Sequence, residues 1–220
     1  MNKRTIISLF IFLFLLQQSI LAQQITDRLD NIPYELSIYN SPEKYIIEGS
    51  KVIISAKGKT NLFNNPNGKS KISNAPMILF EPKGDFTLSA KVTGELEAIY
   101  DVAALVLFQD EDVWAKLCYE NSVAKQPTIV SVVTRTYSDD CNSQVVGKSA
   151  YLSIVKKGKE FSFFYSKDGA DWTMIRSFHL DTNDGLKIGF AVHGSRGDGF
   201  TGIFSEIRFE EKTLEDMRTL

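Results

Sequence analysis

The sequence contains few of the residues that metal sites and nucleophilic catalysis require. Only two histidines (His179 and His193) and two cysteines (Cys118 and Cys141) occur among 220 residues. These residues lack the spacing of a zinc site, and neither histidine lies beside a nucleophile as in a Ser-His-Asp triad. We therefore predict no metal, no cofactor and structural roles for both histidines, and we favour a protein that is not an enzyme.

An excess of charge of one sign is also lacking. Lys and Arg number 25 against 27 Asp and Glu, which gives a net charge of −2, and the basic residues are not clustered. Because phosphate backbones are bound by clustered Lys and Arg, we expect no nucleic-acid partner. The chain has no repeat of 20–50 residues, and its 43% hydrophobic content is enough for one domain with its own core.

A long apolar run occurs only at the N-terminus. Two basic residues precede Ile6–Leu16, and polar residues then lead to Ala22. This is the order of a secretory signal peptide, and the run is shorter than the 20 or so residues of a membrane span. We predict a cleaved signal peptide over residues 1–22, a single domain over 23–220, and a secreted or periplasmic protein that meets the membrane only before cleavage.

Short β-rich runs with turn residues between them make up most of the chain after a loose segment that ends near Asn40. The predicted strands cover residues 45–47, 52–55, 77–80, 86–92, 102–108, 113–119, 128–136, 150–156, 160–166, 173–179, 186–193 and 202–210. Helical apolar spacing occurs only over 213–220, where Thr213 and Asp216 have capping-box spacing and predict a short C-terminal helix. Many short strands with few helices predict an antiparallel sandwich or barrel.

One predicted hairpin carries an unusual set of side chains. Alternation places Trp114, Lys116, Cys118 and Glu120 on one face of their strand. Matching the apolar residues of the next strand to those of this strand brings Arg135 beside Trp114. An aromatic platform among hydrogen-bonding groups suits a sugar ring. The alternative is a tryptophan packed under a loop, with the charged residues forming salt bridges.

Several motifs resemble the family called domain of unknown function 1349, which includes regulator-of-enolase type proteins. The motifs are Thr60–Phe63, Gly84–Thr87, Trp114–Glu120, Val130–Arg135, Ser138–Ser143, Tyr165–Gly169 and Trp172. The resemblance extends from about Tyr45 to Phe209. It implies a two-sheet antiparallel jelly roll, similar in fold to concanavalin A-like lectins and glucanases, but it implies no activity.

The chain also departs from the pattern of this family. Asn61 stands where the family typically has Asp, which weakens any acid-base role there, and 191–196 replaces a different family stretch. Cys118 matches the family and Cys141 does not, so we predict that both thiols are free.

Two functions remain open. The first is a secreted module that binds a carbohydrate or glycoconjugate on its concave sheet. Its candidate ligand-binding residues are Asn61, Asp101, Trp114, Lys116, Glu120, Arg135, Asp139, Asp140 and Asn142. The alternative is a polysaccharide hydrolase or lyase that uses Glu120 with Asp139 or Asp140. The Glu-x-Asp-x-(x)-Glu signature of laminarinase-like enzymes is absent, so the binding module is favoured.

Overall fold

The structure, a computed structural model, describes residues 23–25 and 28–220. The predicted signal peptide over 1–22 lies outside the described residues. The described part is all β-strand and loop and has no helix, hence none able to cross a membrane.

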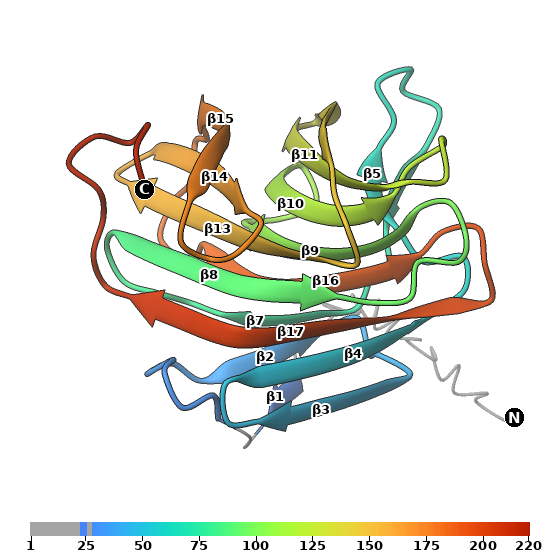
Figure 1. Cartoon of the computed structure of the whole chain (residues 1–220), viewed down its shortest axis with the longest axis horizontal. Coiled ribbons are helices and arrows are strands. Elements are labelled where there is room, and N and C mark those ends of the chain that lie inside the picture. The colour runs from blue at the N-terminus through green and yellow to red at the C-terminus, as the bar shows by residue number, and fades with distance from the viewer. Residues whose placement is uncertain (1–22, 26–27) are drawn as a thin grey trace, which may run out of the picture.

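Two large antiparallel sheets form a sandwich, with the β-strands arranged in two layers (Figure 1). The eight-stranded sheet has the order β1 (Gln23–Ile25), β2 (Leu36–Tyr39), β7 (Met77–Phe80), β16 (Lys187–Gly194), β9 (Asp101–Phe108), β10 (Val113–Asn121), β11 (Pro127–Arg135) and β12 (Tyr137–Val145). The seven-stranded sheet has the order β15 (Trp172–His179), β14 (Glu160–Ser166), β13 (Ser149–Lys157), β8 (Phe86–Thr93), β17 (Gly199–Glu210), β4 (Lys51–Lys57) and β3 (Lys44–Glu48). The predicted two-sheet jelly-roll sandwich is confirmed.

The predicted strands are all present, but three predictions are wrong. The segment before Asn40, predicted to be loose, contains β1 and β2 of the eight-stranded sheet. The C-terminal tail forms turns and bends instead of a helix, although Asp216 accepts a hydrogen bond from the Arg218 amide, as a capping residue does. The stretch after Thr136, where no strand is predicted, is the nine-residue edge strand β12. Eight of its nine residues are exposed, so no buried face imposes the apolar alternation that marks a strand.

The main core lies between the two sheets. Leu105, Leu117 and Val133 project into it from the eight-stranded sheet, and Leu88, Ile154 and Phe163 project from the seven-stranded sheet. The residues between them on β9, β10 and β11 face the opposite way and are also largely buried, so these strands are buried on both faces. The face of the eight-stranded sheet that is turned away from this core is called the outer face below.

Residues 59–75 lie over the outer face and are called the cover segment. They contain the small hairpin of β5 (Leu62–Asn64) and β6 (Lys71–Ser73), and β5 stands apart from both sheets at the upper right of Figure 1. Leu62 and Ala75 are fully buried in a second apolar cluster with Met77, Trp114 and Val132. The cover segment therefore turns part of an open sheet face into an interior.

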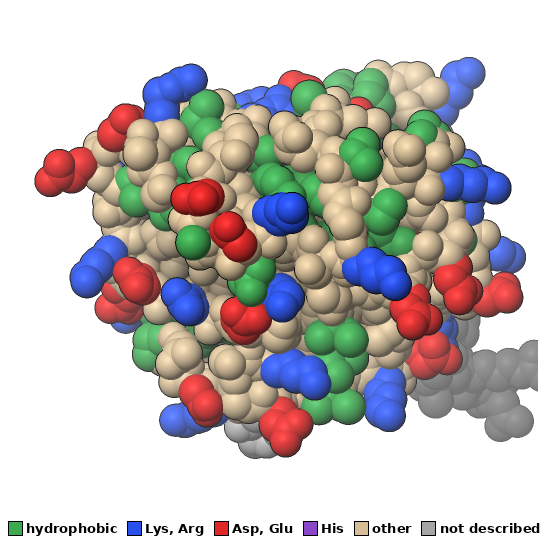
Figure 2. Space-filling model, viewed as in Figure 1, with side chains coloured by type: hydrophobic (Ala, Val, Ile, Leu, Met, Phe, Trp, Pro, Cys, Tyr) green, Lys and Arg blue, Asp and Glu red, His purple; other side chains and the backbone are tan. Residues whose placement is uncertain are grey.

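The surface outside this region carries charges of both signs. On the face seen in Figure 2, Lys and Arg side chains are interspersed with Asp and Glu, without an extended patch of one sign.

The two cysteines lie on different strands with another strand between them. Cys118 of β10 is opposite Val130 of β11, and Cys141 of β12 is opposite Ser131. Two strand spacings amount to about 9–10 Å, beyond the reach of roughly 7 Å for a disulfide between Cα atoms. Cys118 is buried and Cys141 exposed, so this geometry agrees with the prediction of free thiols.

Candidate functional site

A cavity of about 420 Å³ lies between the outer face and the cover segment. The eight-stranded sheet contributes Lys116, Glu120, Val130, Val132, Asp140 and His193 to its lining. The cover segment contributes Lys59, Thr60, Asn61, Phe63, Asn65, Ser70 and Ile72, and Tyr100, Ser195 and Arg196 complete the lining.

Strand register explains why these sheet residues meet. Glu120 of β10 and His193 of β16 both pair with Val102 of the strand between them. Lys116 pairs with Val132, which in turn pairs with Asp140. Residues opposite one another in register project from the same face of a sheet, so all four polar side chains reach the outer face.

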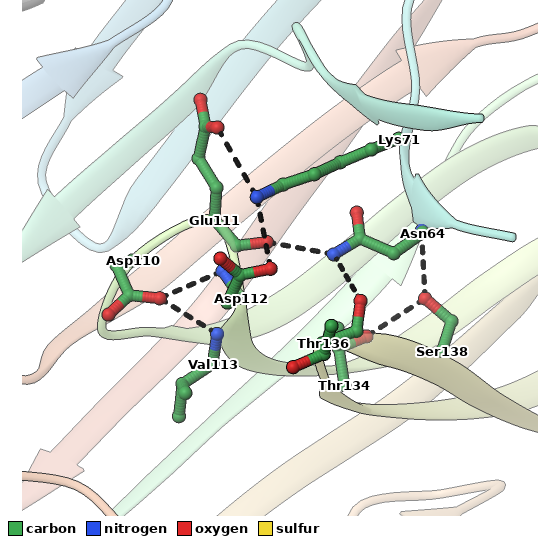
Figure 3. A network of polar contacts seen from close by, with 9 residues as sticks. All are labelled: Asn64, Lys71, Asp110, Glu111, Asp112, Val113, Thr134, Thr136 and Ser138. Atoms are coloured by element: carbon green, nitrogen blue, oxygen red, sulfur yellow. Dashed lines mark hydrogen bonds and ion pairs between the residues drawn. The ribbon is translucent and has the colours of Figure 1, made fainter. Parts of the chain in front are cut away.

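The cover segment is held at one end by a buried amide. Asn64 donates its side-chain N–H groups to the carbonyls of Glu111 (2.9 Å) and Thr136 (3.0 Å), and its backbone N–H to the Ser138 hydroxyl (2.9 Å) (Figure 3). Lys71 adds ion pairs to Glu111 and Asp112 at the surface. Because the Asn64 bonds are shielded from water, they contribute more than surface contacts do to holding this end.

The other end of the cover segment is joined to β16. The Thr60 hydroxyl accepts a hydrogen bond from the Gly194 amide (3.2 Å), and the Thr60 carbonyl accepts one from the Ser195 hydroxyl (3.2 Å). Both ends of the segment are therefore fixed to the sandwich, with the cavity beneath them.

The structure overturns the expected role of Trp114 as an exposed stacking platform. Its side chain is completely buried, in one apolar cluster with Leu62, Val106 and Phe108. Its indole N–H has no hydrogen-bond partner. The alternative from the sequence is correct in placing the tryptophan beneath a loop, since the cover segment shields this ring. Its other part is wrong, because Lys116, Glu120 and Arg135 form no salt bridge with any described residue.

Lys116, His193 and Ser195 form a hydrogen-bonded chain along the wall of the cavity. The Lys116 ammonium lies 2.9 Å from the Leu62 carbonyl and 3.0 Å from Nε2 of His193. Because an ammonium only donates, Nε2 accepts and the imidazole proton is on Nδ1, 3.2 Å from the Ser195 hydroxyl. Burial, and then the charge of Lys116, lower the pKa of His193 well below its usual value. His193 is therefore neutral at pH 7.

Glu120 is the most perturbed carboxyl group of the cavity. Burial raises its pKa to about 7; the Lys116 charge opposes this shift and the Asp140 charge adds to it. Asp140, by contrast, is on the exposed edge strand. In its protonated form Glu120 can donate a hydrogen bond to a ligand, and the carboxyl oxygens of Glu120 and Asp140 can accept hydrogen bonds from it.

Four of the nine predicted ligand-binding residues line this cavity: Asn61, Lys116, Glu120 and Asp140. The side-chain oxygen of Asn61 accepts the backbone N–H of Leu62, so part of this residue shapes the cover segment itself.

The other predicted residues lie elsewhere. Arg135 is one residue out of the expected register, pairs with Val113, and donates to the His179 carbonyl. Asp139 forms an ion pair with Arg176 at 2.8 Å. Asp101 accepts the backbone N–H groups of residues 97 and 98 beside a second, larger depression. Trp114 is in the apolar cluster, and Asn142 is an exposed residue of β12 outside the cavity lining.

The wrong register has a simple cause. Ile129 and Val133 of β11 face the main core, while Val130 and Val132 face the outer cluster, so apolar residues mark both faces. A strand of this kind gives no indication of which residues to align, and a shift of one position reverses every side chain.

The sequence reasoning missed His193, Tyr100, Ser195 and Arg196. Alternation along 187–194 could have placed His193 on the same strand face as Ala191, but not beside Lys116, which is 77 residues away. His193 and Ser195 also lie in the stretch where the chain departs from the pattern of the resembled family.

With this geometry established, comparison with known proteins assigns the chain to a family. The model of the family described as "Protein of unknown function (DUF1349)" matches residues 38–212, and the chain belongs to this family. The chain is similar to "Regulation of enolase protein 1" of Saccharomyces cerevisiae, with 24% identity over 171 residues that cover 76% of this chain and 85% of the yeast protein.

Solved structures share the fold. A functionally unknown protein from Saccharomyces cerevisiae has a TM-score of 0.75 at 22% identity, over 80% of this chain and 95% of that one. A xylan β-1,4-xylosidase from Bacillus halodurans has a TM-score of 0.60 at 13% identity; the match covers 83% of this chain but only 40% of the xylosidase. At these identities the likeness establishes the jelly-roll sandwich, while function must come from the site.

Proposed function

We propose that this protein is a secreted β-sandwich module that binds a carbohydrate or glycoconjugate in the cavity beneath the cover segment. The observation that carries the proposal is the division of the cavity lining into an apolar part and a polar part. Val130, Val132, Phe63 and Ile72 supply apolar surface, and charged and hydrogen-bonding side chains surround it.

A sugar ring matches such a lining because its C–H faces are apolar and its hydroxyl edge both donates and accepts hydrogen bonds. Lys116 supplies donors, and the carboxyl oxygens of Asp140 supply acceptors. The volume of about 420 Å³ lies within the usual range of small-molecule sites, about 300–1,000 Å³. This is room for a short saccharide.

Two further observations support this assignment. The fold is similar to part of a protein named as a xylosidase, which acts on a carbohydrate. The N-terminal sequence has the features of a signal peptide, and export would bring the domain into contact with extracellular or periplasmic glycans.

Two neighbouring aspartates provide a matched test. Asp140 lines the cavity, whereas Asp139 projects from the other face of β12 and pairs with Arg176. We expect Asp140→Asn to weaken binding of a glycan identified on an array by about tenfold or more, since a charge-assisted hydrogen bond contributes roughly 1.5–3 kcal/mol. Asp139→Asn should bind like the wild type in calorimetric titration. If both variants lost the same amount of affinity, the glycan would not be bound in the cavity.

A second candidate function is favoured by Glu120 alone. A carboxyl group whose pKa is raised to about 7, in the same cavity as the carboxyl group of Asp140, resembles the general acid of a glycosidase with a second carboxyl group available in its cavity. Asp139 no longer qualifies as a partner because it faces away. Release of reducing sugar from the array-identified glycan by the wild type, and its loss in Glu120→Gln with binding retained, would favour hydrolysis. Binding without release would favour the module.

A further inference from the structure

The Lys116 ammonium is buried without a counter-ion. The residue is 2% exposed, and its three polar or aromatic neighbours are the Leu62 carbonyl, the His193 imidazole and, at 5.7 Å from the ring centroid, Trp114. None of these carries a negative charge. No Asp or Glu in the described part of the chain lies within 4.0 Å of the ammonium. Buried charges in proteins are normally paired, because removing them from water is costly.

His193 cannot supply the missing negative charge. Its Nε2 lone pair is already used by Lys116, and its Nδ1 proton is directed to Ser195, whose hydroxyl donates to the Thr60 carbonyl. The chain of donors thus begins at the ammonium and ends at a backbone carbonyl. Every polar atom in it has a partner, so the network orients Lys116 without neutralising it.

The rest of the lining adds positive charge. Lys59 and Arg196 are exposed at the cavity and form no ion pair with any described carboxylate. Against these three cations stand Asp140 and Glu120, and Glu120 is only partly ionised at pH 7. The cavity therefore has an excess of positive charge in a chain whose net charge is −2.

We infer that the natural ligand is an acidic saccharide, of the uronic-acid class, whose carboxylate pairs with the Lys116 ammonium. This inference rests on the proposed function and adds the charge of the ligand to it. A single carboxylate supplies the missing counter-ion, while the sugar ring to which it is attached covers the apolar surface of Val130 and Val132. A neutral sugar would leave Lys116 buried and unpaired.

The experiment compares acidic sugars with their neutral counterparts. Isothermal titration at pH 7 and low salt would use glucuronic and galacturonic acid and their short oligosaccharides, with glucose, galactose and the matching neutral oligosaccharides. We expect the acids to bind at least tenfold more tightly than the neutral sugars, and the difference to shrink as salt is raised. Lys116→Met should abolish the difference.

Two more variants test the preference for acidic sugars if Lys116→Met does not fold. Arg196→Gln, at an exposed position, should reduce the preference for acids by a few fold without changing the melting temperature. Lys187→Met is the matched control, because Lys187 belongs to the same sheet but pairs with Glu81 outside the cavity lining. It should keep the full preference.

The outcomes separate the inference from the proposed function. Equal affinity for acidic and neutral sugars would overturn the inference and leave carbohydrate binding in place. Sodium acetate binding as tightly as the uronic acids would also overturn it, since the site would then recognise a simple anion. Absence of binding by every saccharide would overturn the proposed function itself.

Discussion

The two faces of the eight-stranded sheet are both buried, but by different means. The inner face packs against a second sheet and is mostly apolar, with Leu105, Leu117 and Val133 among its residues. The outer face is buried only by the cover segment. There a tryptophan-centred apolar cluster adjoins a cavity that contains Lys116, Glu120 and His193.

The two faces therefore differ in what their side chains contribute to the protein. The inner face is what a sandwich requires in order to fold, because it removes apolar surface from water. The outer face retains an unpaired ammonium, a neutral histidine and a carboxyl group with a raised pKa, none of which folding requires. Buried ionisable groups collected in a cavity are typical of functional sites, which is why the candidate site is placed here.

The largest expected effect tests whether the outer apolar cluster is a true core. Trp114→Ala should lower the free energy of unfolding by about 3–5 kcal/mol, as truncation of a buried aromatic residue in a core does. Trp172→Ala is the control, because Trp172 is only partly buried against a small cluster near the C-terminus. Urea denaturation should show a clearly smaller loss for the control. Equal losses would mean that the cover segment protects Trp114 poorly.

The second largest expected effect is a dependence of the unfolding free energy on pH, caused by Glu120. The pKa of Glu120 is about 7 in the folded protein against an ordinary 4.5, so its contribution to stability is complete below pH 4.5 and disappears as the pH rises through 7. The loss is on the order of 3 kcal/mol. His193, whose folded pKa is lowered, acts in the opposite direction as the pH falls below about 6.5.

The contribution of Glu120 to the pH dependence of stability is measured by comparing the wild type with a variant that lacks this carboxyl group. Unfolding free energies of the wild type and Glu120→Gln, measured from pH 4 to 8.5, should diverge between pH 4.5 and 8, with the wild type losing stability relative to the variant. Parallel curves would show that the Glu120 carboxyl is solvated as on an ordinary surface.

The third effect concerns the anchor of the cover segment. Asn64→Ala removes two hydrogen bonds from the buried Asn64 amide to the carbonyls of Glu111 and Thr136, and we expect a loss of unfolding free energy of about 1–3 kcal/mol. Hydrogen exchange should accelerate over residues 59–75 more than in the inner strands. Asn67→Ala, an exposed change within the same segment, should leave both measurements nearly unchanged; a similar acceleration there would mean that Asn64 is not the anchor.

The smallest expected effect is a difference in reactivity between the two cysteine thiols. Burial raises the pKa of the Cys118 thiol to about 12, while Cys141 is exposed. We expect one equivalent of thiol reagent to react with the native protein at Cys141, and the second only on unfolding. Peptide mass spectrometry would identify the modified residue. Rapid labelling of Cys118 would show that the cavity side of β10 opens readily.

How much the sequence could predict depended on the element. Alternation and turn residues identified every strand of the seven-stranded sheet and the five central strands of the eight-stranded sheet, β7, β16, β9, β10 and β11. They did not identify β1, β2, β5, β6 or β12, because strands of three or four residues and an exposed edge strand bury too little surface to impose a clear pattern. The alternation that grouped Trp114, Lys116 and Glu120 was right, but Arg135 was assigned to their face because β11 is apolar on both sides.

The sequence by itself determined that this is a β-sandwich of one family, and which side chains of β10 share a face, since period-two alternation and turn chemistry are local properties. Only the tertiary structure decided that the cover segment buries Trp114, and that His193 meets Lys116 across 77 residues of chain. It also decided that Asp140 joins them while Asp139 pairs with Arg176. These outcomes depend on strand order and on register, which arise when distant segments pack together, so no local pattern encodes them.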